Sequence, residues 1–100
     1  MEINFERTEN EILAKLSGRL DTATAVEFEK YIAPIAEGNP NRVILDCTEF
    51  EYISSTGLRL FLTLQKAIKA NSGELTIRNL NVEIKTVFDM TGFTSLFSFE

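Results

Sequence analysis

Residues 42–70 read "RVILDCTEFEYISSTGLRLFLTLQKAIKA", and two patterns within them decide the fold. The first six residues, 42–47, form a short apolar run without alternation, which predicts a strand that is covered on both faces. From about Ser55 to Ala70, apolar residues recur at helical spacing, which predicts an amphipathic helix. Because a buried strand followed by a helix is the repeating unit of α/β proteins, we expect 42–47 at the centre of a sheet.

Two further strands are predicted near the N-terminus. Residues 2–6, "EINFE", alternate polar and apolar side chains, as a half-buried strand does. Residues 11–20, "EILAKLSGRL", place Ile12, Ala14 and Leu16 on one face. The connection "TEN" between them is short enough for an antiparallel hairpin.

A helix is predicted between this hairpin and the central strand. The residues "GRLD" lead into "TATAVEFEKYIAPIAEG", in which apolar residues again follow helical spacing. Thr24 and Glu27 have the spacing of a capping box, in which each side chain accepts from the other residue's backbone N–H. Pro34 is expected to kink or end this helix near its last turn.

The C-terminal part of the sequence continues the alternation of strands and helices. Residues 74–80, "ELTIRNL", predict a strand, and 81–92 predict a helix that Gly92 closes. Residues 95–99, "SLFSF", predict a fifth, short strand. The order of elements implies one α/β domain over 1–100: a sandwich with a mixed, mostly parallel sheet of four to five strands, one antiparallel edge strand, and helices packed on it.

The segments "GRLD" and "YISSTG" each follow a strand and precede a helix. In a sheet of this kind, functional loops lie beyond the carboxyl ends of the strands. We therefore expect both segments to lie at one edge of the molecule.

Composition excludes several classes of function. The chain has 100 residues, a formal net charge of −5, one cysteine and no histidine. The negative charge argues against binding to nucleic acid or to an anionic membrane surface. The lack of histidine removes the commonest general base and metal ligand. Without a signal-peptide pattern or an apolar run of membrane-spanning length, a cytoplasmic location is expected.

The sequence also offers no cofactor or metal site that fits a known pattern. Cys47 lies inside the apolar strand run and is expected to be a core residue. Asp46, Glu49 and Glu51 do not have the spacing of an oxygen-ligand loop, so we interpret them as an acidic strand end and the loop that follows it. A nucleotide-binding module is disfavoured because no glycine-rich phosphate loop is present.

Three hydroxyl residues, Ser54, Ser55 and Thr56, stand at the entrance of the predicted helix. One of them can serve as the N-cap, while the others tolerate exposure. Nucleophilic catalysis is disfavoured, because the chain lacks histidine, the G-x-S-x-G elbow and a Ser-x-x-Lys spacing. A phosphoryl group would be tolerated there, near the unpaired N–H groups and the positive end of the helix dipole.

The predicted helix carries a second apolar stripe beside the one that faces the sheet. Leu58 and Leu62 lie on this neighbouring face, and they either cover more of the core or form an exposed docking patch. Arg59, one turn beyond Ser55, either pairs with a phosphate or is a solvated helix residue. The residues of the first stripe are Gly57, Leu60, Phe61, Leu64, Ala67 and Ile68.

Two stretches, "DCTEFEYISSTGL" and "GRLDTATAVEFEKYI", resemble the STAS domain of bacterial anti-anti-sigma factors, and the resemblance covers essentially the whole chain. It implies a regulatory protein and not an enzyme. In this family the unmodified protein binds an anti-sigma factor that is also a serine kinase of the Bergerat ATP-binding fold, and so frees the sigma factor. The kinase then phosphorylates a serine at the start of the second helix, which breaks the complex, and a metal-dependent serine phosphatase resets it.

The resemblance also implies roles for single residues. Ser55 matches the phosphorylated serine, and Asp21 matches an aspartate of the kinase interface, although a capping role for Asp21 is equally compatible with its position. Ser54 departs from the aspartate that many members have there. The residues expected to bind partners are Asp21, Ser54, Thr56, Gly57, Leu58 and Leu62; no catalytic, cofactor or metal residue is expected.

Two further expectations follow from the resemblance. The sequence stops at Glu100, before the final helix that many members carry, so the C-terminal edge is expected either to be shorter or to depend on Phe97 and Phe99 for cover. Some STAS proteins are non-switching subunits of transporters or stress-sensing complexes, which is the alternative function.

Overall fold

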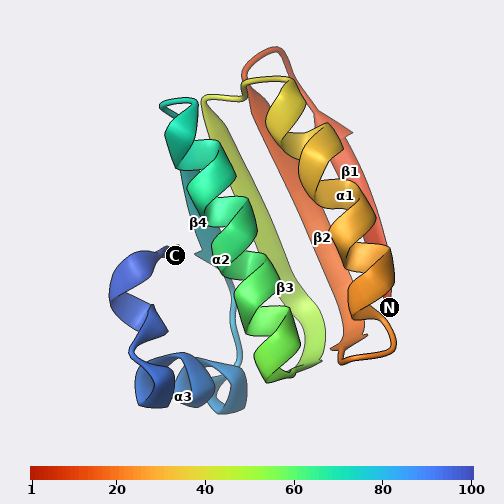
Figure 1. Ribbon diagram of the computed structural model, residues 1–100, viewed down its shortest axis with the longest axis vertical. Coiled ribbons are helices and arrows are strands. Elements are labelled where there is room, and N and C mark those ends of the chain that lie inside the picture. Colours follow the sequence, from red (N-terminus) through yellow and green to blue (C-terminus); the bar gives the residue numbers. More distant parts are fainter.

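The computed structural model describes residues 1–100, which form one five-stranded sheet with helices on one of its faces (Figure 1). The strands lie in the order β1-β2-β3-β4-β5; β1 is antiparallel to β2 and the other pairs are parallel. The predicted mixed sheet with one antiparallel edge strand is therefore confirmed, with 42–47 in its central strand. The elements are β1 (Glu2–Arg7), β2 (Glu11–Leu20), α1 (Ala25–Glu37), β3 (Arg42–Ile53), α2 (Ser55–Ala70), β4 (Glu74–Arg78), α3 (Val82–Thr91), a 3₁₀ turn (Phe93–Leu96) and β5 (Ser98–Phe99).

The hydrophobic core fills the space between the sheet and the helices. In Figure 1, α1 and α2 lie side by side over the strands, and α3 lies beyond the end of β4. Phe61 of α2 is fully buried at the centre of this core. Its ring centroid lies 5.5, 5.8 and 6.2 Å from those of Phe28 in α1, Phe50 in β3 and Phe88 in α3. One aromatic side chain thus joins three elements to α2.

The central strand is longer than the sequence predicts. It continues past 42–47 to Ile53, through residues that were expected to form a loop. Lys15 pairs with Asp46 and Ser17 pairs with Glu49, so β3 has one residue more than β2 between these two pairs. A second irregularity follows at Gly18. Such bulges break the alternation of inward and outward side chains. The buried residues of this half strand, Cys47, Phe50 and Ile53, are accordingly spaced by three, which hides the strand from a pattern search.

The start of α1 has a capping box, but the predicted pair of residues is wrong. The Thr24 side chain makes no capping hydrogen bond to the helix. The Glu27 N–H donates to the Thr24 carbonyl at 3.0 Å and not to its side chain. Instead the Thr24 N–H donates to Asp21 Oδ1 at 3.0 Å, and the Asp21 N–H donates to Thr24 Oγ1 at 3.0 Å. The two reciprocal hydrogen bonds of the capping box therefore join residues three positions earlier than predicted. Aspartate is a better N-cap residue than threonine, and the Asp21 carbonyl also accepts a hydrogen bond from the Ala25 N–H at 2.9 Å.

Other boundaries shift by a few residues. α1 does not end at Pro34 but continues to Glu37. β4 ends at Arg78 and not at residue 80, because Asn79 turns the chain with a φ of 59°. The predicted end of α3 is confirmed, since Gly92 has the left-handed conformation with a φ of 78°. No helix is long and apolar enough to cross a membrane.

The C-terminal edge of the sheet is covered as expected. The two-residue strand β5 pairs with β4, and Phe97 and Phe99 pack edge-on against Phe88 at centroid distances of 5.5 and 5.8 Å. These aromatic contacts join β5 to α3.

Asp21→Asn is expected to lower the stability of the protein at neutral pH. The hydrogen bond from the Thr24 backbone holds the pKa of the Asp21 carboxyl below its usual value of 3.8. A carboxyl group with a lowered pKa stabilises the folded state above its unfolded pKa, and this stabilisation is lost as the pH falls through the folded pKa. Urea unfolding should therefore show a difference between wild type and variant at about pH 7 that shrinks at about pH 2.5. An equal difference at both pH values would contradict a role for the charge.

Gly57→Ala is also expected to be destabilising, although alanine favours helices. A Cβ at Gly57 would lie 2.8 Å from Leu20 Cγ and 2.9 Å from Ile53 Cγ1, and both neighbours are buried. Overpacking should outweigh the gain of about 1 kcal/mol in helix propensity and lower the free energy of unfolding by about 1–2 kcal/mol. Thr63→Ala, at an exposed position of the same helix, is the control and should change stability by less than about 0.5 kcal/mol. A more stable Gly57→Ala variant would show that α2 can move away from the sheet.

Candidate functional site

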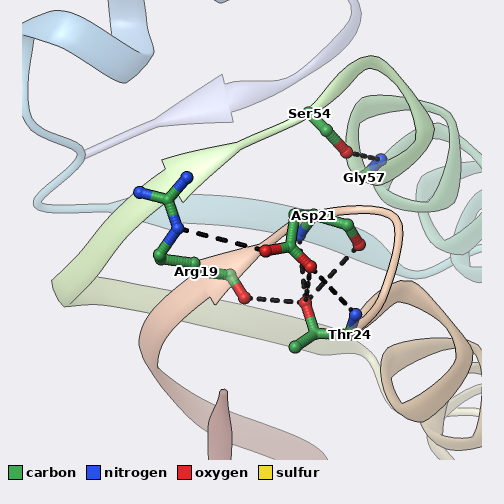
Figure 2. A network of polar contacts seen from close by, with 5 residues as sticks. All are labelled: Arg19, Asp21, Thr24, Ser54 and Gly57. Atoms are coloured by element: carbon green, nitrogen blue, oxygen red, sulfur yellow. Dashed lines mark hydrogen bonds and ion pairs between the residues drawn. The ribbon is translucent and has the colours of Figure 1, made fainter.

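Two loops meet at the carboxyl edge of the sheet. Leu20 and Ile53, the last residues of β2 and β3, are paired in register. The Ser54 N–H continues this ladder by donating to the Leu20 carbonyl at 2.8 Å. Asp21 and Ser54, which follow the paired residues, therefore lie on neighbouring loops (Figure 2), as the sequence predicts.

Ser54 is the N-cap of α2. Its Oγ accepts a hydrogen bond from the Gly57 N–H at 3.2 Å, and its backbone is extended, as in most N-caps. Its carbonyl accepts from the Leu58 N–H at 2.9 Å, which begins the helical hydrogen-bond pattern. The half-buried Ser54 hydroxyl is therefore committed to the helix start.

Ser55 has a different environment. It is the first residue of α2, it is exposed, and its hydroxyl has no hydrogen bond within the protein. Neighbouring N–H groups of the first helical turn have no intrahelical partner, and the helix dipole is positive at this end. Thr56, the next residue, is half-buried. Of the three hydroxyl residues, Ser55 is thus the most accessible and the one whose modification leaves the cap intact.

Asp21 is fixed in place by its neighbours (Figure 2). Besides the Thr24 N–H, its Oδ1 accepts from Thr24 Oγ1 at 3.2 Å, and the same hydroxyl reaches the Arg19 carbonyl at 2.8 Å. The Arg19 Nε lies 4.0 Å from Asp21 Oδ2. The Asp21 side chain remains 37% exposed, so that one side of an oriented, ionised carboxylate faces solvent. Capping and a surface role are thus compatible.

Arg19 and Tyr52 belong to this edge, and sequence reasoning missed them. They are paired across β2 and β3, and the Arg19 guanidinium lies 4.2 Å from the centroid of the Tyr52 ring, in a cation–π contact. The bulges of β3 shift the register of the strand pair and so place Arg19 opposite Tyr52. Without knowledge of those bulges, no spacing in the sequence indicates this contact.

The two apolar candidates of α2 have different environments. Leu58 is 3% exposed and belongs to the core, so its expected contribution to an exposed docking patch is wrong. The reason is that the start of α2 packs closely on Leu20 and Ile53, which draws Leu58 inward with the buried Gly57. Leu62, one turn further on, is only half-buried.

The remaining polar candidates have local structural roles. Asp46 Oδ1 accepts hydrogen bonds from the Thr48 N–H at 3.1 Å and the Thr48 hydroxyl at 2.6 Å, which lower the pKa of the Asp46 carboxyl. Cys47 is 1% exposed, and burial raises the pKa of its thiol well above the usual range, so its assignment to the core is confirmed. No three acidic, cysteine or histidine side chains converge as metal ligands would.

Comparisons with known proteins identify the family. Residues 2–100 match the STAS domain. BtrV of Bordetella bronchiseptica is 32% identical over 97 residues, which are 97% of this chain and 84% of BtrV. The anti-sigma-B factor antagonist of Staphylococcus aureus is 31% identical over 98 residues, which are 96% of this chain and 91% of that protein.

A solved structure shows the same fold. The Bacillus cell fate determinant SpoIIAA in its phosphorylated form superposes with a TM-score of 0.76 at 19% identity, over 99% of this chain and 91% of SpoIIAA. The match at the level of sequence extends over nearly the whole chain. The chain therefore belongs to the STAS domain family of anti-sigma factor antagonists.

Proposed function

We propose that this protein is an anti-sigma factor antagonist whose binding is switched off by phosphorylation of Ser55. In the unphosphorylated form it binds an anti-sigma factor that is also a serine kinase of the Bergerat fold, and this binding frees the sigma factor. A metal-dependent serine phosphatase restores the binding form. The proposed role is regulatory, which the name of the Staphylococcus aureus relative, an anti-sigma-B factor antagonist, supports, and its proposed location is the cytoplasm.

The observation that carries the proposal is the division of roles between two adjacent serines. Ser54 makes the capping hydrogen bond, whereas Ser55 is exposed and has no partner. A kinase can reach the Ser55 hydroxyl without first breaking the helix cap. A phosphoryl group on it would lie near the positive end of the helix dipole, which favours negative charge. The related fold of SpoIIAA has been solved in a phosphorylated form, which adds support.

Phosphorylation would act on binding more than on folding. It adds a charge of about −1.5 to −2 at an exposed position beside the surface that a partner covers. Burying that charge in an interface requires its desolvation, and a cost of about 3 kcal/mol lowers affinity about a hundredfold. The proposed contact surface comprises Asp21, Ser54, Thr56 and Leu62, while Gly57 and the buried Leu58 hold the helix start in position.

The direct test of the acceptor is mass spectrometry of the protein isolated from its native host. A fraction of molecules heavier by about 80 Da, with the added phosphoryl group localised to Ser55, is expected. Affinity capture with the unmodified protein should recover a kinase of the Bergerat fold. An unmodified protein under all growth conditions would contradict the switch and favour a non-switching STAS subunit.

Ser55→Asp is expected to weaken binding to this kinase by about tenfold to a hundredfold, measured by calorimetry. Thermal unfolding should show an equal or slightly higher stability, because an acidic residue in the first turn is favourable by about 0.3–1 kcal/mol. Ser95→Asp, which adds the same charge at an exposed position on the 3₁₀ turn, is the matched control and should bind as the wild type does. Wild-type affinity in Ser55→Asp would overturn the proposal.

Ser54→Ala separates the cap from the acceptor. Loss of the hydrogen bond from the Gly57 N–H should lower stability by about 1 kcal/mol, measured by urea unfolding. The kinase should still phosphorylate Ser55 in this variant, whereas Ser55→Ala should abolish incorporation of phosphate without that loss of stability. Phosphate found on Ser54 of the wild type would show that Ser54, and not Ser55, is the acceptor.

A further inference from the structure

The exposed face of α2 has a charge opposite to that of the whole protein. The chain has a net charge of −5, yet α2 contains Arg59, Lys66 and Lys69 and no acidic residue. By contrast, α1 has three glutamates against one lysine, and α3 has two acidic residues against one lysine. We call Arg59, Lys66 and Lys69 the basic stripe.

The basic stripe follows one side of the helix and begins next to the candidate phosphoacceptor. Ser55, Arg59, Leu62, Lys66 and Lys69 succeed one another at steps of four, three, four and three residues, which places them on one face of an α-helix. The three cations are exposed and Leu62 is half-buried. No other helix or strand covers α2 on the side away from the sheet (Figure 1).

These three cations have no partner within the protein. The five ion pairs of the structure involve Lys15, Arg19, Arg42, Arg78 and Lys85, and none involves the basic stripe. Lys69 lies in the last turn of α2, where a cation stabilises the helix dipole. Arg59 and Lys66 have no such role. Their charges are therefore free for a partner molecule.

We infer that the basic stripe binds an acidic surface on the anti-sigma factor, and that phosphorylated Ser55 opposes this binding partly by pairing with Arg59. The inference rests on the proposed function and specifies the chemistry of the partner. Leu62 supplies an apolar contact between the cations. An acidic protein surface fits better than nucleic acid or an anionic bilayer, because the acidic remainder of a protein of net charge −5 repels a polyanion that extends beyond the stripe, whereas a compact acidic patch meets only the three cations.

The dimensions of the helix make this effect local. Arg59 lies about 6 Å along the axis from Ser55, within reach of a phosphate, whereas Lys69 lies about 21 Å away. The second distance exceeds the screening length of about 8–10 Å at physiological salt. The phosphate would thus neutralise the first cation of the stripe and leave the last one unchanged. Phosphorylation would therefore weaken the contact of the partner with the N-terminal end of α2, near Ser55, and not with its C-terminal end.

The test measures binding of the kinase recovered from the native host, after its purification, to charge variants of this protein. Lys66→Glu is expected to lower affinity about tenfold, and wild-type affinity should fall steeply between about 50 and about 500 mM NaCl. Lys30→Glu, the same change at an exposed lysine of α1 without an ion pair, is the matched control and should have wild-type affinity. In Arg59→Gln, Ser55→Asp should weaken binding less than it does in the wild type.

Three results would overturn the inference: equal affinities of Lys66→Glu and wild type, binding that does not depend on salt, or an unchanged effect of Ser55→Asp in the Arg59→Gln background. The first two can occur while Ser55 still switches binding, so they leave the proposed function intact. Folding of each variant is checked by thermal unfolding.

A second experiment tests the inference about the basic stripe even if no kinase is recovered. Titration of the ¹⁵N-labelled protein with an octaglutamate peptide should shift the amide resonances of Arg59, Lys66 and Lys69, and the shifts should vanish in the double variant Arg59→Gln/Lys66→Gln. Absent shifts, or shifts spread evenly over all basic residues, would overturn the inference. Cosedimentation with phosphatidylglycerol vesicles that depends on the stripe, with no response to the peptide, would also overturn it in favour of a membrane surface.

Discussion

The parallel pairing of β2 with β3 is the constraint on which the rest of the structure depends. It extends to the last residues of both strands, Leu20 and Ile53, and the Ser54 N–H adds one more hydrogen bond to it. This pairing brings the loops of Asp21 and Ser54 together, and it provides the two buried side chains against which Gly57 packs. Because Gly57 has no side chain, the start of α2 can lie close to the sheet. This close packing of helix on sheet buries Phe61 among three other aromatic rings.

The same geometry explains why two serines stand at the start of the helix when one would serve as a cap. A side chain at the N-cap is turned back toward the N–H groups of the first turn and is partly covered, as Ser54 is. The following residue, Ser55, is exposed, and its hydroxyl makes no hydrogen bond within the protein. A cap must turn toward the helix and be partly covered, whereas the proposed phosphoacceptor must be exposed, and two adjacent residues meet these two requirements separately.

Sequence patterns predict those parts of the fold in which the periodicity is regular. The alternation in β2, the helical spacing in α2 and the left-handed Gly92 all correspond to elements that the structure confirms. The second half of β3 is not predictable in this way, because its bulges replace the period of two with a spacing of three.

Errors in the candidate site have the same origin. Two overlapping pairs, Asp21 with Thr24 and Thr24 with Glu27, both have the spacing of a capping box, and the choice between them depends on where β2 stops pairing. Leu58 was ambiguous because its burial depends on the short distance between α2 and the sheet and not on its helical position alone. The predicted meeting of Asp21 and Ser54 was correct because it depends only on the order of strands and helices.

The proposed switch requires that a phosphate changes the affinity for the partner without changing the folding stability, and the position of Ser55 permits this. Ser55 is exposed, is not part of the core, and makes no hydrogen bond through its hydroxyl, so a phosphate there breaks no interaction that holds the fold together. The first turn of a helix stabilises an anion, so the modified state is not penalised within the molecule. The unfavourable energy of the phosphate therefore arises almost wholly when a partner removes its water. Under the proposed function, an acceptor at an exposed helix start would make the two states differ in binding while both keep the same fold.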